Sequence, residues 1–221
     1  MKKISIQSDW IKILALITMS VAHIDLILTH TYWLNNTIGR MAFPLFAFLL
    51  MSNFCTYHPV KKYISRLTIF GIITQVIFWV FHIPCSNILF TFLYAIIFIS
   101  IAEKTSRKYN LLHQAYYLIL AFIVLFPLIW YAGYNVLGFF FLLALYAYLQ
   151  KHSKTNYWAV LLTSAAINST DIVVMLFSVL TTFSMISIIH IKRSNRIIKW
   201  WWFYAYYPAH LLLLQLLKTI W

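Results

Sequence analysis

Nine apolar runs occupy most of this chain and constrain its fold more than any other feature. A helix that crosses a bilayer needs about 20 apolar residues, whereas the strands of a membrane β-barrel are short and alternate in polarity. These runs are apolar all round, so we expect transmembrane helices. They cover Trp10–Leu28, Ile38–Tyr57, Leu67–His82, Ile88–Ala102, Leu112–Tyr131, Val136–Leu149, Tyr157–Asn168, Ile172–Ile191 and Trp202–Ile220.

The composition excludes a water-soluble fold. Of the 221 residues, 63% are hydrophobic and only 10% are charged, against roughly 25% charged residues in a soluble domain. A soluble fold of this length exposes too much surface to hide so many apolar side chains. The predicted fold class is therefore all-α, a polytopic transmembrane helix bundle of about nine spans, forming a single domain over residues 1–221.

The basic residues set the orientation of the bundle. Net charge is +13, and all of the 17 Lys and Arg except Lys12, Arg40 and Lys218 precede the first run or lie in alternate loops. The other loops (29–37, 83–87, 132–135 and 169–171) contain no Lys or Arg. By the positive-inside rule the N-terminus is cytoplasmic and, after nine crossings, the C-terminus lies outside. These cations contact anionic lipid, and none of their runs is long enough to bind nucleic acid.

The segment Tyr157–Ile191 is the weakest part of this topology. It offers about 35 residues for two crossings that need roughly 40. The charge pattern requires an even number of crossings here, so we expect two. The alternatives are none, which gives seven spans in total, and a broken or re-entrant helix that lines a cavity.

A few strongly polar residues fall inside the apolar runs, where they are costly and usually functional. His23, Arg40 and His210 are the main ones. A lone intramembrane His more often forms a hydrogen bond between helices, and Arg40 could extend its side chain to the headgroups. Against that, Arg40 lies on the side that otherwise lacks basic residues. Asp9 and Lys12 are three residues apart and are expected to form an ion pair. The two cysteines give no metal-ligand spacing.

Several motifs, in order along nearly the whole chain, resemble the TraX family of pilin N-acetyltransferases. Gly39-Arg40-Met41-Ala42-Phe43-Pro44-Leu45-Phe46 is similar to the family's most distinctive motif, and Asn87-Ile88-Leu89-Phe90 matches another. The opening motif resembles Asp9-Trp10-Ile11-Lys12 followed by Met19-Ser20-Val21-Ala22-His23. The closing motif resembles residues 203–211, Phe-Tyr-Ala-Tyr-Tyr-Pro-Ala-His-Leu. The family is distantly similar to membrane acyltransferases that modify cell-surface sugars.

One position departs from the family pattern. Where the family usually has Asp-His, this chain has Ala22-His23. Asp25 is two residues further, about 200° around a helix, so it is not expected to reach the same imidazole. Asp171, in the turn after the seventh run, is the preferred substitute.

The resemblance implies transfer of an acetyl group from acetyl-CoA to the N-terminal amine of a pilin subunit, in the bacterial inner membrane. His23 is the candidate base and Arg40 the candidate stabiliser of the oxyanion. The last run starts at the inner side, and His210 lies about 12 Å along it, near the middle of the membrane. It is therefore placed further from the outer surface than His23 and is the candidate relay. Arg66, Lys61 and Lys62 are candidates to bind the CoA phosphates. The alternatives are an O-acyltransferase acting on a cell-envelope glycan, and a non-enzymatic transporter or pilus assembly factor.

Overall fold

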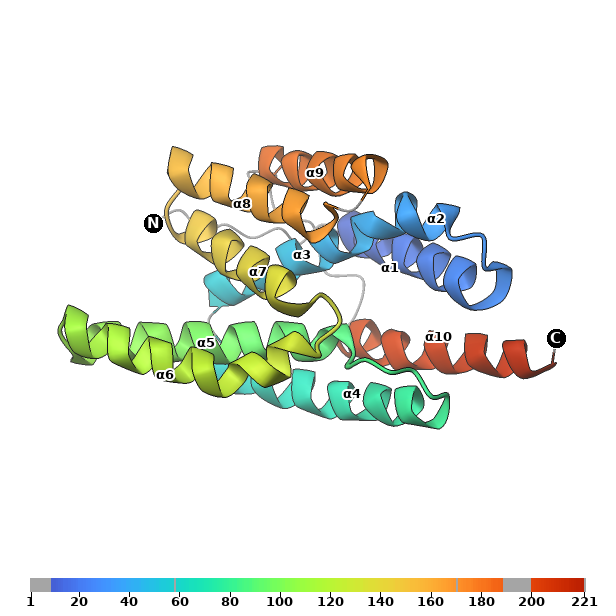
Figure 1. Ribbon diagram of the computed structural model, residues 1–221, viewed down its shortest axis with the longest axis horizontal. Helices are drawn as coiled ribbons and strands as arrows, with labels where there is room; N and C mark the ends of the chain where they lie inside the picture. The colour runs from blue at the N-terminus through green and yellow to red at the C-terminus, as the bar shows by residue number, and fades with distance from the viewer. Residues whose placement is uncertain (1–8, 58, 170, 189–199, 221) are drawn as a thin grey trace. The chain divides into compact units, whose positions relative to one another are not determined.

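The described part of the chain consists mainly of helices (Figure 1). The computed structural model describes residues 9–57, 59–169, 171–188 and 200–220. Two compact units are present, the first made of Met1–His58 with Ala144–Trp221 and the second of Pro59–Leu143. The expectation of a single domain over residues 1–221 stays a prediction. Lys2, Lys3, residues 189–191 of the predicted eighth run, and the basic residues between 192 and 199 lie outside the described residues.

Each predicted run corresponds to a helical segment among the described residues. The first is α1 (Asp9–Ile24), continued by a π-helical turn, η1 (Asp25–Thr29). The second consists of α2 (Trp33–Asn36), a 3-10 turn η2 (Ile38–Met41) and α3 (Ala42–Tyr57). The others are α4 (Val60–Val80), α5 (Ile88–Lys108), α6 (Leu111–Trp130), α7 (Asn135–Gln150), α8 (Lys154–Ile167), α9 (Ile172–Ser187) and α10 (Trp200–Ile220).

Helix ends differ from the predicted run ends mainly where basic residues occur. Helix α4 begins at Val60 rather than at Leu67, and α5 extends to Lys108 rather than to Ala102. Hydropathy marks only the part of a helix that lies in hydrocarbon. Lys and Arg are good helix formers, so the backbone continues through them toward water.

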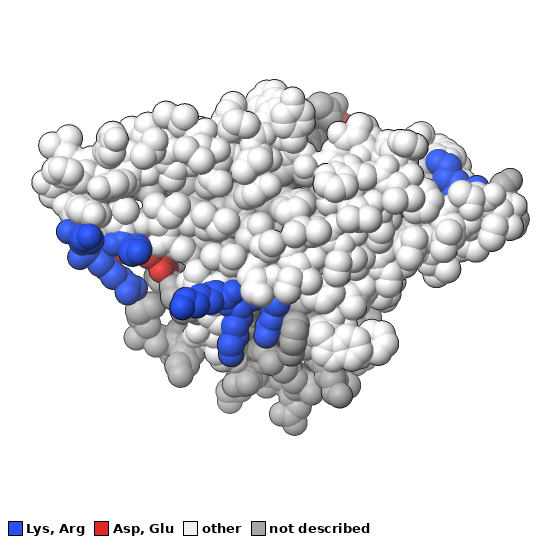
Figure 2. Space-filling model, turned by 90° about the horizontal axis from the view of Figure 1, so that it is seen from below, with Lys and Arg blue, Asp and Glu red and all other residues white. Residues whose placement is uncertain are grey.

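Five of the helical segments in the described ranges are long and apolar enough to cross a membrane: Asp9–Thr29, Trp33–Tyr57, α4, α5 and α6. Helix α6 buries only Leu125 and Ile129 and exposes most of its other apolar side chains, as a lipid-facing helix does. Figure 2 shows a face on which Lys and Arg form a few small groups and most of the surface is uncharged. These features indicate a multi-pass membrane protein.

Helices α7, α8 and α9 are each shorter than a standard crossing and, in the described ranges, are not lengthened by an adjoining helical turn. Helices α7 and α9 have 16 residues each and α8 has 14. At about 1.5 Å per residue they span about 21–24 Å, less than the roughly 30 Å of a hydrocarbon core. Helices α8 and α9 pack against each other as a hairpin, which agrees with two helices in this segment, while the two crossings stay a prediction.

Helix α3 forms the core of the first unit. Its side chains Phe43, Leu45, Phe48 and Met51 are at most 1% exposed, and it packs against α1 and α9. Between α8 and α9, the buried hydroxyl of Ser164 lies 3.0 Å from that of Ser178 and 2.8 Å from that of Thr182. Small polar residues of this kind let membrane helices approach closely and bond to each other.

In the second unit, α5 packs against both α4 and α6, and Asn87 joins α4 to α5. Its side chain caps α5 by accepting from the Leu89 N–H and donates to the Gly71 carbonyl at 2.9 Å and to Gln75 Oε1 at 3.1 Å. Gly71 has no side chain, and a Cβ there would lie 3.2 Å from the Phe90 ring. The Asn87-Ile88-Leu89-Phe90 motif is thus explained by helix capping and packing.

Candidate active site

Two histidines from opposite ends of the chain form a direct hydrogen bond. His23 Nδ1, near the end of α1, lies 2.8 Å from His210 Nε2 on α10. One turn away along both helices, the Ser20 hydroxyl lies 2.6 Å from the Tyr206 hydroxyl. Residues three or four apart share one helix face, so these two contacts join the same pair of faces. Both helices belong to the first unit.

The partners of His210 determine where the protons of the neutral pair lie. His210 Nδ1 is 2.8 Å from the Tyr206 backbone carbonyl, which can only accept, so Nδ1 carries the proton. In neutral His210 this leaves Nε2 as an acceptor, and His23 Nδ1 must then donate to it. The consequence is a neutral His23 whose Nε2 has a free lone pair. That is the tautomer a general base needs.

Two tyrosines hold the imidazole pair. The Ser20 hydroxyl donates to the Leu16 carbonyl at 2.8 Å, so the Tyr206 hydroxyl donates to Ser20. The Tyr206 ring stacks on His210 with centroids 5.0 Å apart, and the Tyr207 ring lies 6.0 Å from that of His23. Packing of this kind fixes the orientation of both imidazoles.

Arg40 contributes a cation with a buried donor that lacks a partner among the described residues. It lies in η2, and its Nη2 donates to Asn36 Oδ1 at 3.3 Å. Its Nε is buried and has no hydrogen-bond partner among the described residues. A buried guanidinium N–H that lacks a partner is unfavourable, so this donor is suited to a ligand oxygen.

Gly39 lets the backbone beside Arg40 contact the backbone beside His23. A Cβ built at Gly39 would lie 2.6 Å from the Ala22 Cβ and 3.2 Å from the Ala22 Cα, so η2 rests directly on α1. Ala22 and Gly39 immediately precede His23 and Arg40 in the chain. The absent side chain at Gly39 is therefore what allows the two candidate residues to come from adjacent backbones.

We expect Gly39→Ala to disrupt this contact, because its new methyl group would overlap the Ala22 side chain. Thermal unfolding in detergent should show a clear loss of stability, and the acetyl transfer expected from the sequence should fall with it. Ala22→Gly in the same chain removes the atom nearest the added methyl and should restore part of both. If Gly39→Ala behaved as wild type, the close approach of η2 to α1 would be contradicted.

The other predicted site residues lie elsewhere. Asp171 caps α9, accepting from the N–H groups of Val173 at 2.8 Å and Val174 at 3.4 Å, and its side chain is exposed. Lys61, Lys62 and Arg66 lie in the first two turns of α4, in the second unit. No group of three His, Cys, Asp or Glu suited to a metal ion occurs in the described ranges.

Sequence reasoning identified both histidines but not how they meet. The hydrogen bond shows that the two side chains meet directly, and the expected difference in their membrane depth stays a prediction. The roles of Ser20 and Tyr206 were missed, although each lies three or four residues from a candidate histidine on the same helix face.

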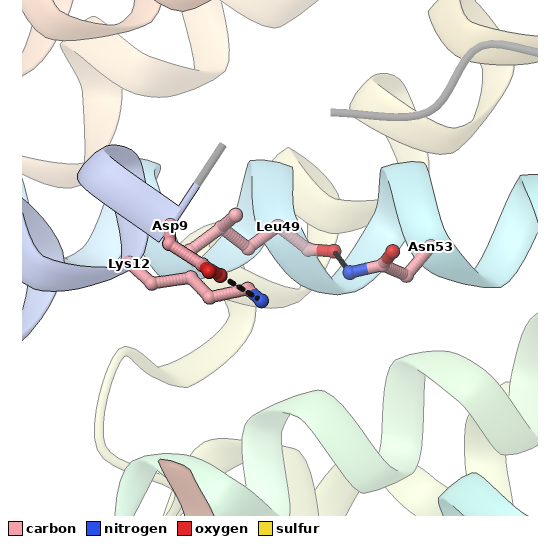
Figure 3. Close-up of polar contacts among 4 residues, drawn as sticks. All are labelled: Asp9, Lys12, Leu49 and Asn53. Atoms are coloured by element: carbon pink, nitrogen blue, oxygen red, sulfur yellow. Dashed lines mark hydrogen bonds and ion pairs between the residues drawn. The ribbon is translucent and has the colours of Figure 1, made fainter. Parts of the chain in front are cut away.

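At the N-terminal end of α1, the predicted ion pair is confirmed. Lys12 Nζ lies 2.8 Å from Asp9 Oδ1, and both side chains are largely buried (Figure 3). On the neighbouring α3, Asn53 Nδ2 donates to the Leu49 carbonyl at 2.7 Å (Figure 3). The Asp9-Trp10-Ile11-Lys12 motif thus places an internally neutralised pair at this helix end.

Comparison with known proteins identifies one family. A family model described as TraX protein matches residues 7–218, nearly the whole chain. A search of curated proteins gave no match, and neither did a search of solved structures.

Proposed function

Because this chain belongs to the TraX family, we propose that it is an integral membrane acetyltransferase that modifies the N-terminal amine of a pilin subunit. Acetyl-CoA is the donor, and the enzyme acts in the bacterial inner membrane. The observation that carries the proposal beyond family membership is the His23–His210 hydrogen bond. It supplies a base with a defined tautomer, and the backbone beside His23 contacts the backbone beside Arg40.

The reaction requires removal of protons from the acceptor. An N-terminal amine has an ordinary pKa of about 7.7–8.0, so it is largely protonated at neutral pH and cannot attack until it loses a proton. His23 Nε2 takes that proton. As His23 becomes an imidazolium, its Nδ1–H can pass to His210 Nε2, so the charge is shared between two rings.

The two histidines and Arg40 are sufficient to account for every bond and proton in the reaction. The amine nitrogen attacks the thioester carbonyl carbon, forming the amide C–N bond, and the C–S bond then breaks. The oxyanion that forms in between is stabilised by the free Nε–H of Arg40. Of the two protons that the ammonium nitrogen loses, one ends on the CoA thiolate and the other is released through the imidazole pair.

Lys61, Lys62 and Arg66 are proposed to bind the CoA phosphates. Lys61 and Lys62 are exposed, and all three residues lie at one end of α4. Cations paired with phosphate oxygens form strong hydrogen bonds. Asp171 stays a predicted site residue. Its carboxylate already caps α9, so we assign the orienting of His23 to His210.

The test is acetyl transfer in proteoliposomes that contain the purified chain, acetyl-CoA and a membrane-inserted pilin with a free N-terminus. Mass spectrometry of the pilin N-terminal peptide should show one added acetyl group. The added acetyl group should be absent when the enzyme is omitted. Acetylated glycan with unmodified pilin would indicate the O-acyltransferase alternative, and no use of acetyl-CoA would indicate a transporter or assembly factor.

We further propose nine crossings with a cytoplasmic N-terminus and an outer C-terminus. The alternating basic and uncharged loops support this topology. The α8–α9 hairpin returns the chain to the same side whether it crosses twice or re-enters, so the C-terminal location does not depend on its depth.

Reporter fusions should confirm this topology. A fusion after Lys154 is expected to give a cytoplasmic signal, and one after Trp221 a signal from the outer side, because the loop cations remain inside. Fusion after Ala132 provides an internal control for the outer side. A cytoplasmic C-terminus would contradict the nine-span arrangement.

A further inference from the structure

Asp25 is a buried carboxylate that the reaction itself does not use. It begins η1, two residues after His23, and is 0% exposed. Its Oδ1 accepts from the hydroxyls of Thr29, at 2.7 Å, and Thr31, and its Oδ2 accepts from the Asn35 backbone N–H at 2.7 Å. Every one of these donors is neutral. Burying a carboxylate is costly unless hydrogen bonds compensate for the lost water, and here all three of these donors come from the segment that follows.

What Asp25 orders is the loop between η1 and α2. Two non-glycine residues of this loop, His30 and Tyr32, have left-handed backbones with φ of 53° and 59°. Such conformations are unfavourable for residues with a Cβ and persist only where other contacts hold them. The three bonds to Asp25 span this strained stretch from Thr29 to Asn35. The π-helical turn at Asp25–Thr29 widens the end of the helix at the same point.

A second set of bonds continues from this loop to Arg40. Asn35 Nδ2 donates to Asn36 Oδ1 at 3.2 Å, and Arg40 Nη2 donates to the same oxygen at 3.3 Å. Because a guanidinium can only donate, the Asn36 atom that faces it must be the carbonyl oxygen. Asn36 therefore holds one edge of the Arg40 guanidinium, while the Arg40 Nε is left without a partner among the described residues.

We propose that Asp25 is a positioning residue for Arg40. It fixes Asn35, the neighbouring Asn36 amide then holds Nη2, and this orients the free Nε–H toward the reacting oxygen. The proposal rests on the proposed function, because it assigns Arg40 to the oxyanion. It also gives a role to a buried acid that lies two residues after His23 but forms these hydrogen bonds with the segment that follows.

The first test is a double-mutant cycle on acetyl transfer with Asp25→Asn and Asn36→Ala. An amide at position 25 has one acceptor oxygen and must present an NH₂ to groups that donate. Each single change should lower kcat about tenfold with the KM for acetyl-CoA unchanged. The double variant should also be about tenfold slower, because both changes remove the same support. Independent structural damage would multiply to about a hundredfold, and that result overturns the proposal.

The second test does not depend on acetylation. Phenylglyoxal modifies arginine side chains, and mass spectrometry of the modified peptides reports each arginine separately. Modification of Arg40 should be several-fold faster than in wild type in both Asp25→Asn and Asn36→Ala. The double variant should react at the same rate as either single variant. Arg66, in the other unit, should react at its wild-type rate and serves as the internal reference.

Glu103→Gln is the matched control for the change of charge. It replaces an acid by its amide on α5, in the second unit, and should leave kcat and Arg40 modification at wild-type values. An inactive wild-type chain that still shows the modification pattern would refute the acetyltransferase and leave the positioning role intact. Active transfer with unchanged Arg40 reactivity in Asp25→Asn would refute the positioning role alone.

Discussion

Replacing His23 with alanine should lower the rate of acetyl transfer by about 10²–10⁴-fold, the range that a general base contributes. The acceptor nitrogen would then have to lose its proton to water. The expected loss is in kcat, measured in proteoliposomes with the pilin acceptor. Expression and thermal unfolding in detergent should change little, because His23 is only half-buried. Wild-type activity in this variant would remove His23 as the base.

Substitutions at His210 separate orientation from proton relay. His210→Ala removes the acceptor of the His23 Nδ1–H, so the wrong tautomer of His23 becomes accessible and activity should fall strongly. His210→Gln offers a carbonyl oxygen that can accept this bond but cannot take the proton. We therefore expect activity between those of wild type and His210→Ala. His113→Ala, which changes an exposed histidine on α6, is the matched control and should be fully active.

Replacing Arg40 with lysine should lower kcat about 10²–10³-fold, the effect of losing one donor to an oxyanion. The change keeps the positive charge. In arginine, Asn36 holds one N–H while the Nε–H stays available to the oxyanion, and the single ammonium group of lysine cannot reproduce this planar arrangement. The KM for acetyl-CoA should stay near its wild-type value, because the donor's phosphates are assigned to other residues.

The control for Arg40→Lys is the same substitution at Arg107, an exposed residue in the last turn of α5. That variant should retain wild-type kcat. If Arg40→Lys raised KM and left kcat unchanged, Arg40 would bind substrate equally in the ground and transition states. Its assignment to the oxyanion would then be wrong.

The helices themselves were predictable from the sequence because their signal is local. Runs such as Leu112–Tyr131 are apolar over their whole length, and the corresponding helix, α6, differs by one residue at each end. The predicted α8–α9 hairpin was also found. Its turn ends at Asp171, and capping by such a residue is decided by neighbours two and three positions along the chain.

The assembled site depended on contacts that no local signal encodes. His23 and His210 are separated by most of the chain, and their hydrogen bond follows from how α1 and α10 pack. Helix geometry predicts that Asp25, two residues after His23, points away from the imidazole, and its hydrogen bonds agree with this. The sequence does not show that a π-helical turn directs the carboxylate into the following loop. The sequence pattern favours Asp171 as the partner of His23 because it carries no sign that His210 packs against the same imidazole.

The sequence by itself determined the class of environment, the positions of the helices and the residues most costly to place in hydrocarbon. These properties follow from transfer free energies and backbone hydrogen bonding, which act residue by residue. Only the tertiary structure decided which polar residues meet, which tautomer His23 adopts and which donor of Arg40 stays free. Those outcomes depend on helix-to-helix distances of a few ångströms, such as the close approach of Gly39 to Ala22, because a hydrogen bond is lost when its atoms separate by much more than 3 Å.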